Sequence, residues 1–226
     1  MILARHLLAN LTLLDRDDLV ARAIEGLLPP FRTDAVAKRV AECLAQASLP
    51  GIVCRPTLPL GPGEIQLGIS FPFREDGARV RSAIVVAERK IVSFTDPFAV
   101  TCGAEALGAP LGDCLRALIV RAGVRGVRLG VIGSAAFEIV TGLAYTSTAS
   151  DIDLVLATAP ASALHQFAVD AAEIAAAHGI HVDAEVDLGD GCGVKLDEIL
   201  SSSRTVLAKT LEDVRMLERS EVMAAL

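Results

Sequence analysis

The spacing of apolar residues in the N-terminal part of the chain changes from a helical period to an alternating one. Residues 15–28 and 33–47 carry apolar side chains at helical spacing behind the capping residues Asp15 and Thr33, and Pro29-Pro30 separates them. Alternating segments between Gly- and Pro-containing turns follow at residues 52–55, 64–73, 78–87 and 90–94. This order predicts an α+β N-terminal module at residues 1–100.

Strands and helices alternate after residues 95–110, a boundary stretch rich in loop-forming residues. Helical composition is found at residues 111–122, 135–140 and 161–178. Strand patterns are found at residues 127–132, 151–156 and 179–187. We therefore expect residues 111–226 to form a second, larger α+β domain.

The dipeptide Gly133-Ser134 joins a predicted strand to a predicted helix, which Thr141-Gly142 ends. The unpaired amides and positive dipole end of a helix start favour an anionic oxygen, and glycine lets that oxygen approach the backbone closely. Ser134 adds a hydroxyl donor. These features predict a phosphate-binding turn, and the alternative is that Ser134 only caps the helix.

Two aspartates, Asp151 and Asp153, are one residue apart in a strongly apolar strand pattern. Side chains at i and i+2 of a strand project from one face, roughly 6 to 7 Å apart, within reach of a pair of metal ions. Ile152, Leu154 and Leu156 would fill the opposite face. The pattern predicts a divalent-cation site, and the alternative is a turn cap followed by a solvated strand end.

A third carboxylate is expected from the alternating segment 179–187, in which His181, Asp183, Glu185 and Asp187 share one face. Paired strands lie about 4.8 Å apart, so a carboxylate here can stand beside Asp151 and Asp153. Asp183 is the preferred candidate and Glu185 the second. The alternative is an ordinary half-exposed edge strand with a polar outer face, which explains at least two of these four residues.

Charge is distributed unevenly along the chain. Residues 129–226 contain 5 basic and 15 acidic side chains, whereas residues 74–128 contain 9 basic and 6 acidic ones. The acidic surface would repel a polynucleotide, so template-directed polymerase and DNA-binding functions are disfavoured. The basic segment could face an acidic partner protein or a phosphate-bearing ligand. The alternative is that its cations are ordinary solvated side chains. The cations concerned are Arg74, Arg79, Arg81, Arg89 and Lys90.

Composition favours a cytoplasmic protein with free thiols. The five cysteines are odd in number and form no CxxC pair, which argues against a disulfide framework or a zinc site. No apolar run is long enough to span a membrane. Residues 1–14 are interrupted by Arg5, His6 and Asn10 and lack a small-residue cleavage site, so we expect structured chain with helical character there.

Several of these motifs together resemble known proteins. The chain is similar to the nucleotidyltransferase superfamily that includes DNA polymerase beta in Val131-Ile132-Gly133-Ser134, Leu143-Ala144-Tyr145 and Ser150-Asp151-Ile152-Asp153-Leu154. The stretch 133–156, with Val182-Asp183-Ala184-Glu185-Val186 and Val206-Leu207-Ala208-Lys209-Thr210, more closely resembles the phosphoribosyl-dephospho-CoA transferases that act as holo-acyl-carrier-protein synthases of malonate decarboxylase. Pro56 stands where that family has a second arginine, and Phe137-Glu138 where it has Trp-Gln.

The resemblance implies a nucleotidyltransferase fold for the C-terminal domain, with a mixed sheet flanked by helices. It also implies transfer of phosphoribosyl-dephospho-CoA from triphosphoribosyl-dephospho-CoA to a serine of the acyl carrier protein, with release of pyrophosphate. Two Mg²⁺ ions would be held by Asp151 and Asp153, and Asp183 would complete the metal site or act as the base. Gly133 and Ser134 would contact the phosphates, and so would Lys209 unless it is simply a solvated strand lysine.

Two other functions remain open from the sequence. The same fold and metal chemistry could transfer a nucleotidyl group to another small molecule or protein. A nucleotidyltransferase-like domain could also have lost catalysis and serve as a binding module. Neither nucleic acid nor a membrane is expected as a partner in any of these interpretations.

Overall fold

The computed structural model describes residues 4–12, 16–57, 59–189 and 191–226 of the 226-residue chain. The chain divides into two compact units, residues 1–95 and 96–226. Each unit combines one sheet with helices, which confirms the predicted α+β class.

The N-terminal unit contains a five-stranded antiparallel sheet in the order β4-β3-β2-β1-β5. The strands are β1 (Leu8–Leu11), β2 (Gly51–Val53), β3 (Glu64–Glu75), β4 (Ala78–Ala87) and β5 (Ile91–Thr95). Asp76 and Gly77 connect β3 to β4, and both have positive φ, 48° and 77°. This conformation matches the right-handed twist of the paired strands, which explains the long β3–β4 hairpin.

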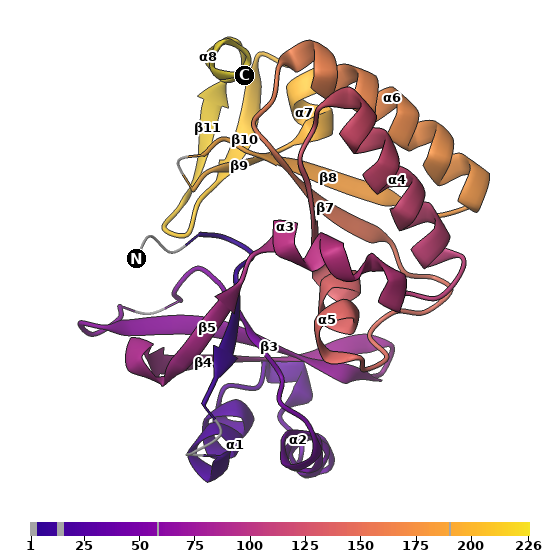
Figure 1. Cartoon of the computed structure of the whole chain (residues 1–226). Helices are drawn as coiled ribbons and strands as arrows, with labels where there is room; N and C mark the ends of the chain where they lie inside the picture. Colours follow the sequence, from indigo (N-terminus) through magenta and orange to yellow (C-terminus); the bar gives the residue numbers. More distant parts are fainter. Residues whose placement is uncertain (1–3, 13–15, 58, 190) are drawn as a thin grey trace. The chain divides into compact units, whose positions relative to one another are not determined.

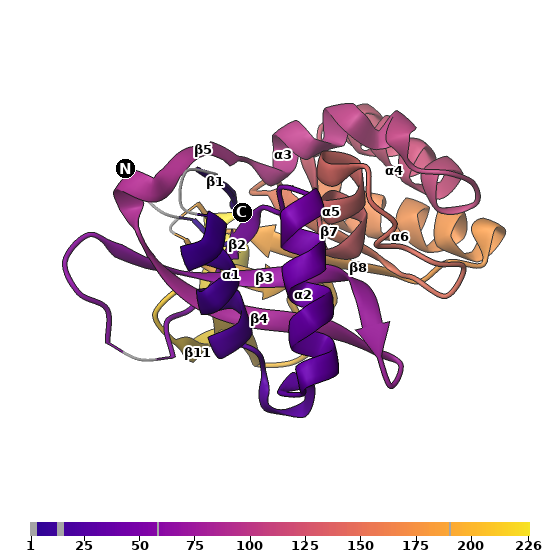
Figure 2. The same ribbon diagram turned by 90° about the horizontal axis from the view of Figure 1, so that it is seen from below.

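Two helices, α1 (Arg16–Glu25) and α2 (Asp34–Gln46), lie side by side across the strands of this sheet (Figure 2). Thr33 caps α2 as predicted, since its hydroxyl accepts a hydrogen bond of 3.3 Å from the amide of Val36. Asp15, the predicted cap of the first helix, lies outside the described residues. Two short 3₁₀ turns, η1 (Pro29–Phe31) and η2 (Glu88–Lys90), complete the unit.

The expected helical character of residues 1–14 is wrong for the residues that can be described. Residues 8–11 form strand β1 between β2 and β5. His6 has a φ of 66°, a left-handed conformation that an α-helix does not accommodate. Pairing with strands on both sides hydrogen-bonds the backbone of β1, so tertiary contacts decide the conformation of this short apolar segment.

The C-terminal unit contains a six-stranded sheet in the order β11-β10-β9-β8-β7-β6. Only β7 and β8 are parallel among the named strand pairs, so the sheet is mixed, as expected. The strands are β6 (Leu129–Ile132), β7 (Ile152–Ala157), β8 (Val182–Asp187), β9 (Gly193–Lys195), β10 (Thr205–Lys209) and β11 (Val214–Glu218).

Helices α4 and α6 pack against each other on one side of this sheet (Figure 1). Gly126 and Gly179 end them in the left-handed conformation, each donating its amide back to the last helical turn. The helical elements are α3 (Pro97–Val100), η3 (Thr101–Ala106), α4 (Leu111–Arg125), α5 (Gly133–Thr141), α6 (Ala161–His178), α7 (Leu196–Leu200) and α8 (Arg219–Ala225). The predicted boundary stretch 95–110 is therefore partly helical, because α3 and η3 pack on β6 and α5.

Asp170 of α6 is a buried charged residue, and it pairs with α4. Arg125 donates to both of its carboxylate oxygens, at 2.6 and 3.1 Å. The hydrogen bond from Arg125 lowers the pKa of Asp170, and partial burial opposes this shift. None of the helices in the described parts of the chain combines the length and apolarity needed to cross a membrane. All five cysteines are free thiols, as expected.

Candidate functional site

Two carboxylates from neighbouring strands meet on the polar face of the six-stranded sheet. The parallel register of β7 and β8 places Asp153 directly beside Asp183. Ile152, Leu154 and Leu156 are fully buried on the opposite face, as their alternation with Asp153 predicts. The structure thus brings together two of the three predicted carboxylates, because α6 returns the chain parallel to β7.

Gly133 begins α5 directly after β6, whose last residue, Ile132, pairs with Asp153. The φ of Gly133 is 67°, in the left-handed region. A Cβ atom at this position would lie 2.1 Å from Oδ2 of Asp153. Glycine is therefore needed both for the backbone conformation and for space, and the start of α5 is a neighbour of the Asp153 carboxylate.

Ser134 is not the N-cap of α5. Ile132 occupies the capping position in an extended conformation and makes no side-chain cap hydrogen bond. The alternative in which Ser134 serves only as a cap is therefore wrong. Amides in the first turn of a helix have no partner within that helix. Of the residues predicted to bind an anion on this helix, Gly133 lies directly beside Asp153.

A cavity of about 110 Å³ opens at the same place. Asp153, Asp183 and Glu185 contribute carboxylates to it, and Lys195 and Lys209 contribute ammonium groups. The lining residues belong to five adjacent strands of the sheet. This mixture of charges suits a ligand that brings both anionic groups and a cation.

Lys195 was not expected at the site. It pairs with Glu185 in the β8–β9 register, and its Nζ reaches Oδ2 of Asp183 at 2.5 Å. The hydrogen bond that Lys195 donates to the Asp183 carboxylate raises the pKa of Lys195 above its ordinary value, so the ammonium stays charged at neutral pH. Strand β9 has three residues, too few for an alternating pattern to be recognised.

Asp151 is exposed and precedes β7, which begins at Ile152. The amide of Ile152 already donates to the carbonyl oxygen of His181 at 2.9 Å. Of the two aspartates expected on this strand, only Asp153 lies within it. Asp151 does not belong to the described lining of the cavity.

A second unexpected residue, Glu138 of α5, holds the loop that leads to Asp151. Its Oε2 accepts hydrogen bonds from the amides of Tyr145 and Thr146, at 2.9 and 2.6 Å, and from Oγ1 of Thr146 at 2.8 Å. Tyr145 also stacks on Phe137, with ring centroids 5.2 Å apart. These two neighbours on α5, which differ from the Trp-Gln of the resembled family, therefore fix the α5–β7 loop.

The chemistry of these donors fits Mg²⁺. Carboxylate oxygens are ligands that Mg²⁺ prefers, and Asp153, Asp183 and Glu185 all line the same cavity. Across the described residues, no three His, Cys, Asp or Glu side chains are grouped to hold a metal. Mg²⁺ is commonly bound by one or two carboxylates together with substrate phosphates, so such a group of three is not required.

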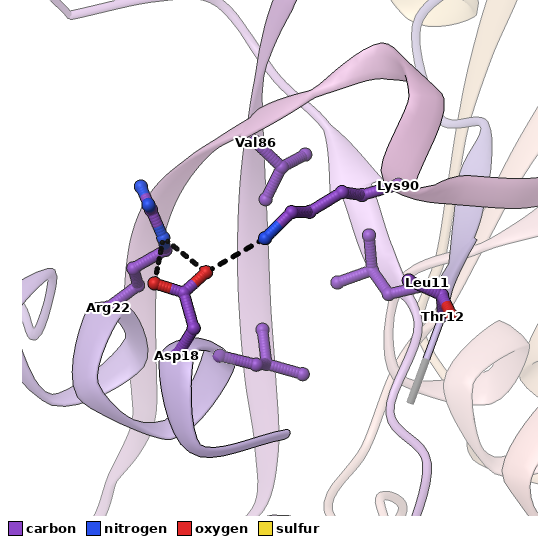
Figure 3. A pocket seen from close by; sticks show the side chains of 7 residues that line it. Leu11, Thr12, Asp18, Arg22, Val86 and Lys90 are labelled. Atoms are coloured by element: carbon purple, nitrogen blue, oxygen red, sulfur yellow. Dashed lines mark hydrogen bonds and ion pairs between the residues drawn. The ribbon is translucent and has the colours of Figure 1, made fainter. Parts of the chain in front are cut away.

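The N-terminal unit has a smaller cavity of about 20 Å³, near the volume of one water molecule (Figure 3). Asp18 stands between Arg22 and Lys90, at 2.9 and 3.0 Å, and these hydrogen bonds lower its pKa. The cluster joins α1 to the turn before β5. It therefore holds these two elements together. Lys90, one of the basic residues expected to face a partner, is part of this cluster. Arg81 and Arg89, two others, are exposed.

The fold and the site define a two-unit α+β protein with a cavity lined by charged side chains on the sheet of its C-terminal unit. Family models of phosphoribosyl-dephospho-CoA transferase MdcG match both units, the N-terminal domain at residues 4–97 and the C-terminal domain at residues 101–220. The chain therefore belongs to the family of phosphoribosyl-dephospho-CoA transferases, which are group-transferring enzymes.

Individual relatives agree with this assignment. A phosphoribosyl-dephospho-CoA transferase of Xanthomonas euvesicatoria is 30% identical over 177 residues, which are 77% of this chain and 81% of the relative. The Bradyrhizobium diazoefficiens enzyme of the same name is 25% identical over 213 residues, 92% of this chain and 84% of the relative. No solved structure gave a significant match to the chain.

Proposed function

We propose that this chain transfers phosphoribosyl-dephospho-CoA from triphosphoribosyl-dephospho-CoA to a serine of the acyl carrier protein of malonate decarboxylase. The observation that carries the proposal is the cavity in which Asp153 and Asp183 meet the start of α5 at Gly133. Membership of the transferase family supports the donor. The five free thiols are in keeping with action in the cytoplasm.

In this reaction the hydroxyl oxygen of the carrier serine attacks the α-phosphorus of the donor. A new P–O bond forms to serine, the bond to the bridging oxygen breaks, and pyrophosphate leaves. Gly133 and Ser134 hold the departing phosphates at the start of α5, with Lys209 across the cavity. Asp183 completes the metal site or accepts the serine proton.

Asp151 and Asp153 are proposed to hold Mg²⁺, with two ions expected for this class of transfer. When bound, Mg²⁺ neutralises negative charge on the phosphates. The fold that we propose for residues 111–226 is that of the nucleotidyltransferase superfamily. The mixed sheet, with carboxylates on β7 and β8 beside the Gly133-Ser134 turn, supports this placement.

The test is incubation of the purified chain with apo acyl carrier protein, triphosphoribosyl-dephospho-CoA and Mg²⁺. The intact mass of the carrier should rise by one phosphoribosyl-dephospho-CoA group, with one pyrophosphate released per carrier. A carrier with its acceptor serine changed to alanine is the matched control. Pyrophosphate release from ATP without a mass change would point to another nucleotidyl acceptor, and no release from either donor would point to a binding module.

A further inference from the structure

Cations are scarce in the acidic part of the chain, and two of them meet in one cavity. Residues 129–226 contain five basic side chains against fifteen acidic ones. Lys195 and Lys209 are the two lysines among those five, and both line the cavity beside Asp153. They share a face because Lys209 pairs with Gly193, two residues before Lys195 in β9.

The position of Lys195 sets the charge of the cavity. Three carboxylates and two ammonium groups line it, so without Lys195 the acidic groups would outnumber the basic ones by two. An entering polyphosphate would then be repelled more strongly, because like charges at short range disfavour each other. Lys195 lines the cavity, and its side chain is 44% exposed.

We infer that Lys195 is a phosphate-binding residue of this cavity and that Asp183 competes with the donor's phosphates for its ammonium. The inference rests on the proposed function and extends it by assigning a role to a residue that the sequence pattern did not reveal. In the structure, Lys195 pairs with Asp183. When pyrophosphate or the donor enters, the ammonium binds the more highly charged phosphate oxygens.

Inorganic pyrophosphate, titrated calorimetrically in EDTA, tests this role without catalysis and without metal. Lys195→Met should raise the Kd about tenfold, equal to about 1.4 kcal/mol. Lys195→Arg should stay near the wild-type affinity, since it keeps the charge. Asp183→Asn should lower the Kd several-fold, because the competing carboxylate charge is gone. Lys38→Met, at an exposed lysine of α2, is the matched control and should change nothing.

Wild-type affinity in Lys195→Met would overturn the inference, as would weaker binding by Asp183→Asn. A purely structural role of the ion pair predicts losses in both variants, so the opposite directions are diagnostic. Melting curves of each variant establish that it is folded.

The carrier-loading assay separates this inference from the proposed function. Pyrophosphate binding that depends on Lys195, without loading of the carrier, would uphold the inference and refute the proposed function. Undiminished pyrophosphate binding in Lys195→Met, with efficient loading by the wild type, would refute the inference and uphold the proposed function.

Discussion

Asp170 and Asp183 each pair with a cation in the C-terminal unit, but their surroundings differ. Asp170 joins two packed helices, its side chain is 11% exposed, and both of its oxygens accept from Arg125. Asp183 lies beside a cavity, its side chain is 34% exposed, and Oδ2 accepts from the single ammonium of Lys195.

The difference lies in how firmly each cation is held. The planar guanidinium of Arg125 matches the carboxylate of Asp170 at two points, which fixes both side chains. Lys195 is a point charge on a flexible stem, and it can exchange partners within the cavity. The first pair is therefore suited to stability and the second to ligand binding. Changes around the two pairs should separate folding from transfer.

The largest effect on transfer is expected from Asp153→Asn. This change keeps the shape of the side chain but removes the charge beside Gly133 and Asp183, so transfer to the carrier should fall roughly 10³-fold. The melting temperature should change little, because Asp153 is only half-buried. Intact-mass kinetics and thermal melts measure the two quantities. Retention of more than a tenth of the wild-type rate would contradict a role for Asp153.

Gly133→Ala should lower transfer about 100-fold, because its Cβ atom would displace the Asp153 carboxylate. The left-handed backbone adds a destabilisation of about 1–2 kcal/mol. Gly142→Ala is the matched control, since Gly142 has a φ of 70° and open space where its Cβ would lie. Denaturant unfolding should show a loss of stability in both variants, and kinetics a loss of transfer in Gly133→Ala alone. Equal transfer rates in the two variants would show that the close approach of Asp153 to Gly133 does not matter for transfer.

Glu138→Ala should have a smaller effect, a decrease in transfer of about tenfold with about 2 kcal/mol less stability. The change removes the acceptor that holds the loop before Asp151. Glu138→Gln keeps one amide oxygen in that position and should recover most of the rate. Wild-type rates for Glu138→Ala in the carrier-loading assay would show that the loop has no influence on transfer.

Asp170→Asn should leave transfer unchanged and lower the melting temperature by roughly 5 °C at pH 7. The pKa of Asp170 is lowered in the folded protein, so its stabilising effect is present above the unfolded pKa near 3.8. The effect is lost as the pH falls through the lower folded pKa. Melting curves from pH 7 to pH 2 should therefore show the difference between variant and wild type closing in acid. A constant difference would mean that packing, and not charge, is lost.

Regular elements with long periodic patterns were predictable from the sequence. The helix expected at residues 161–178 is α6 with the same bounds, and β7 begins one residue after its predicted start. The strand expected from residue 179 begins at Val182, because Gly179 and Ile180 donate their amides back to α6. These end effects depend on capping hydrogen bonds, which the periodic pattern of apolar residues does not reveal.

The chemical character of the candidate site was predictable from the sequence, but only some of its residues were. Gly133, Asp153, Asp183 and Lys209 were expected from the sequence and lie together in the structure. Lys195 and Glu138 were not expected, since one lies in a three-residue strand and the other on a helix face without a distinctive pattern. Their importance comes from contacts with residues distant from them along the chain.

The sequence by itself determined the alternation of strands and helices, the acidic character of the C-terminal part, the glycine turn before a helix and the carboxylates within the strand patterns. Those properties depend on near neighbours along the chain, whose spacing is visible in the sequence. Tertiary structure decided that β1 is a strand, that Lys195 holds Asp183 and that Arg125 holds Asp170. Strand register and helix packing bring together residues that are far apart in the chain, so these pairings follow from the packed fold and not from local pattern.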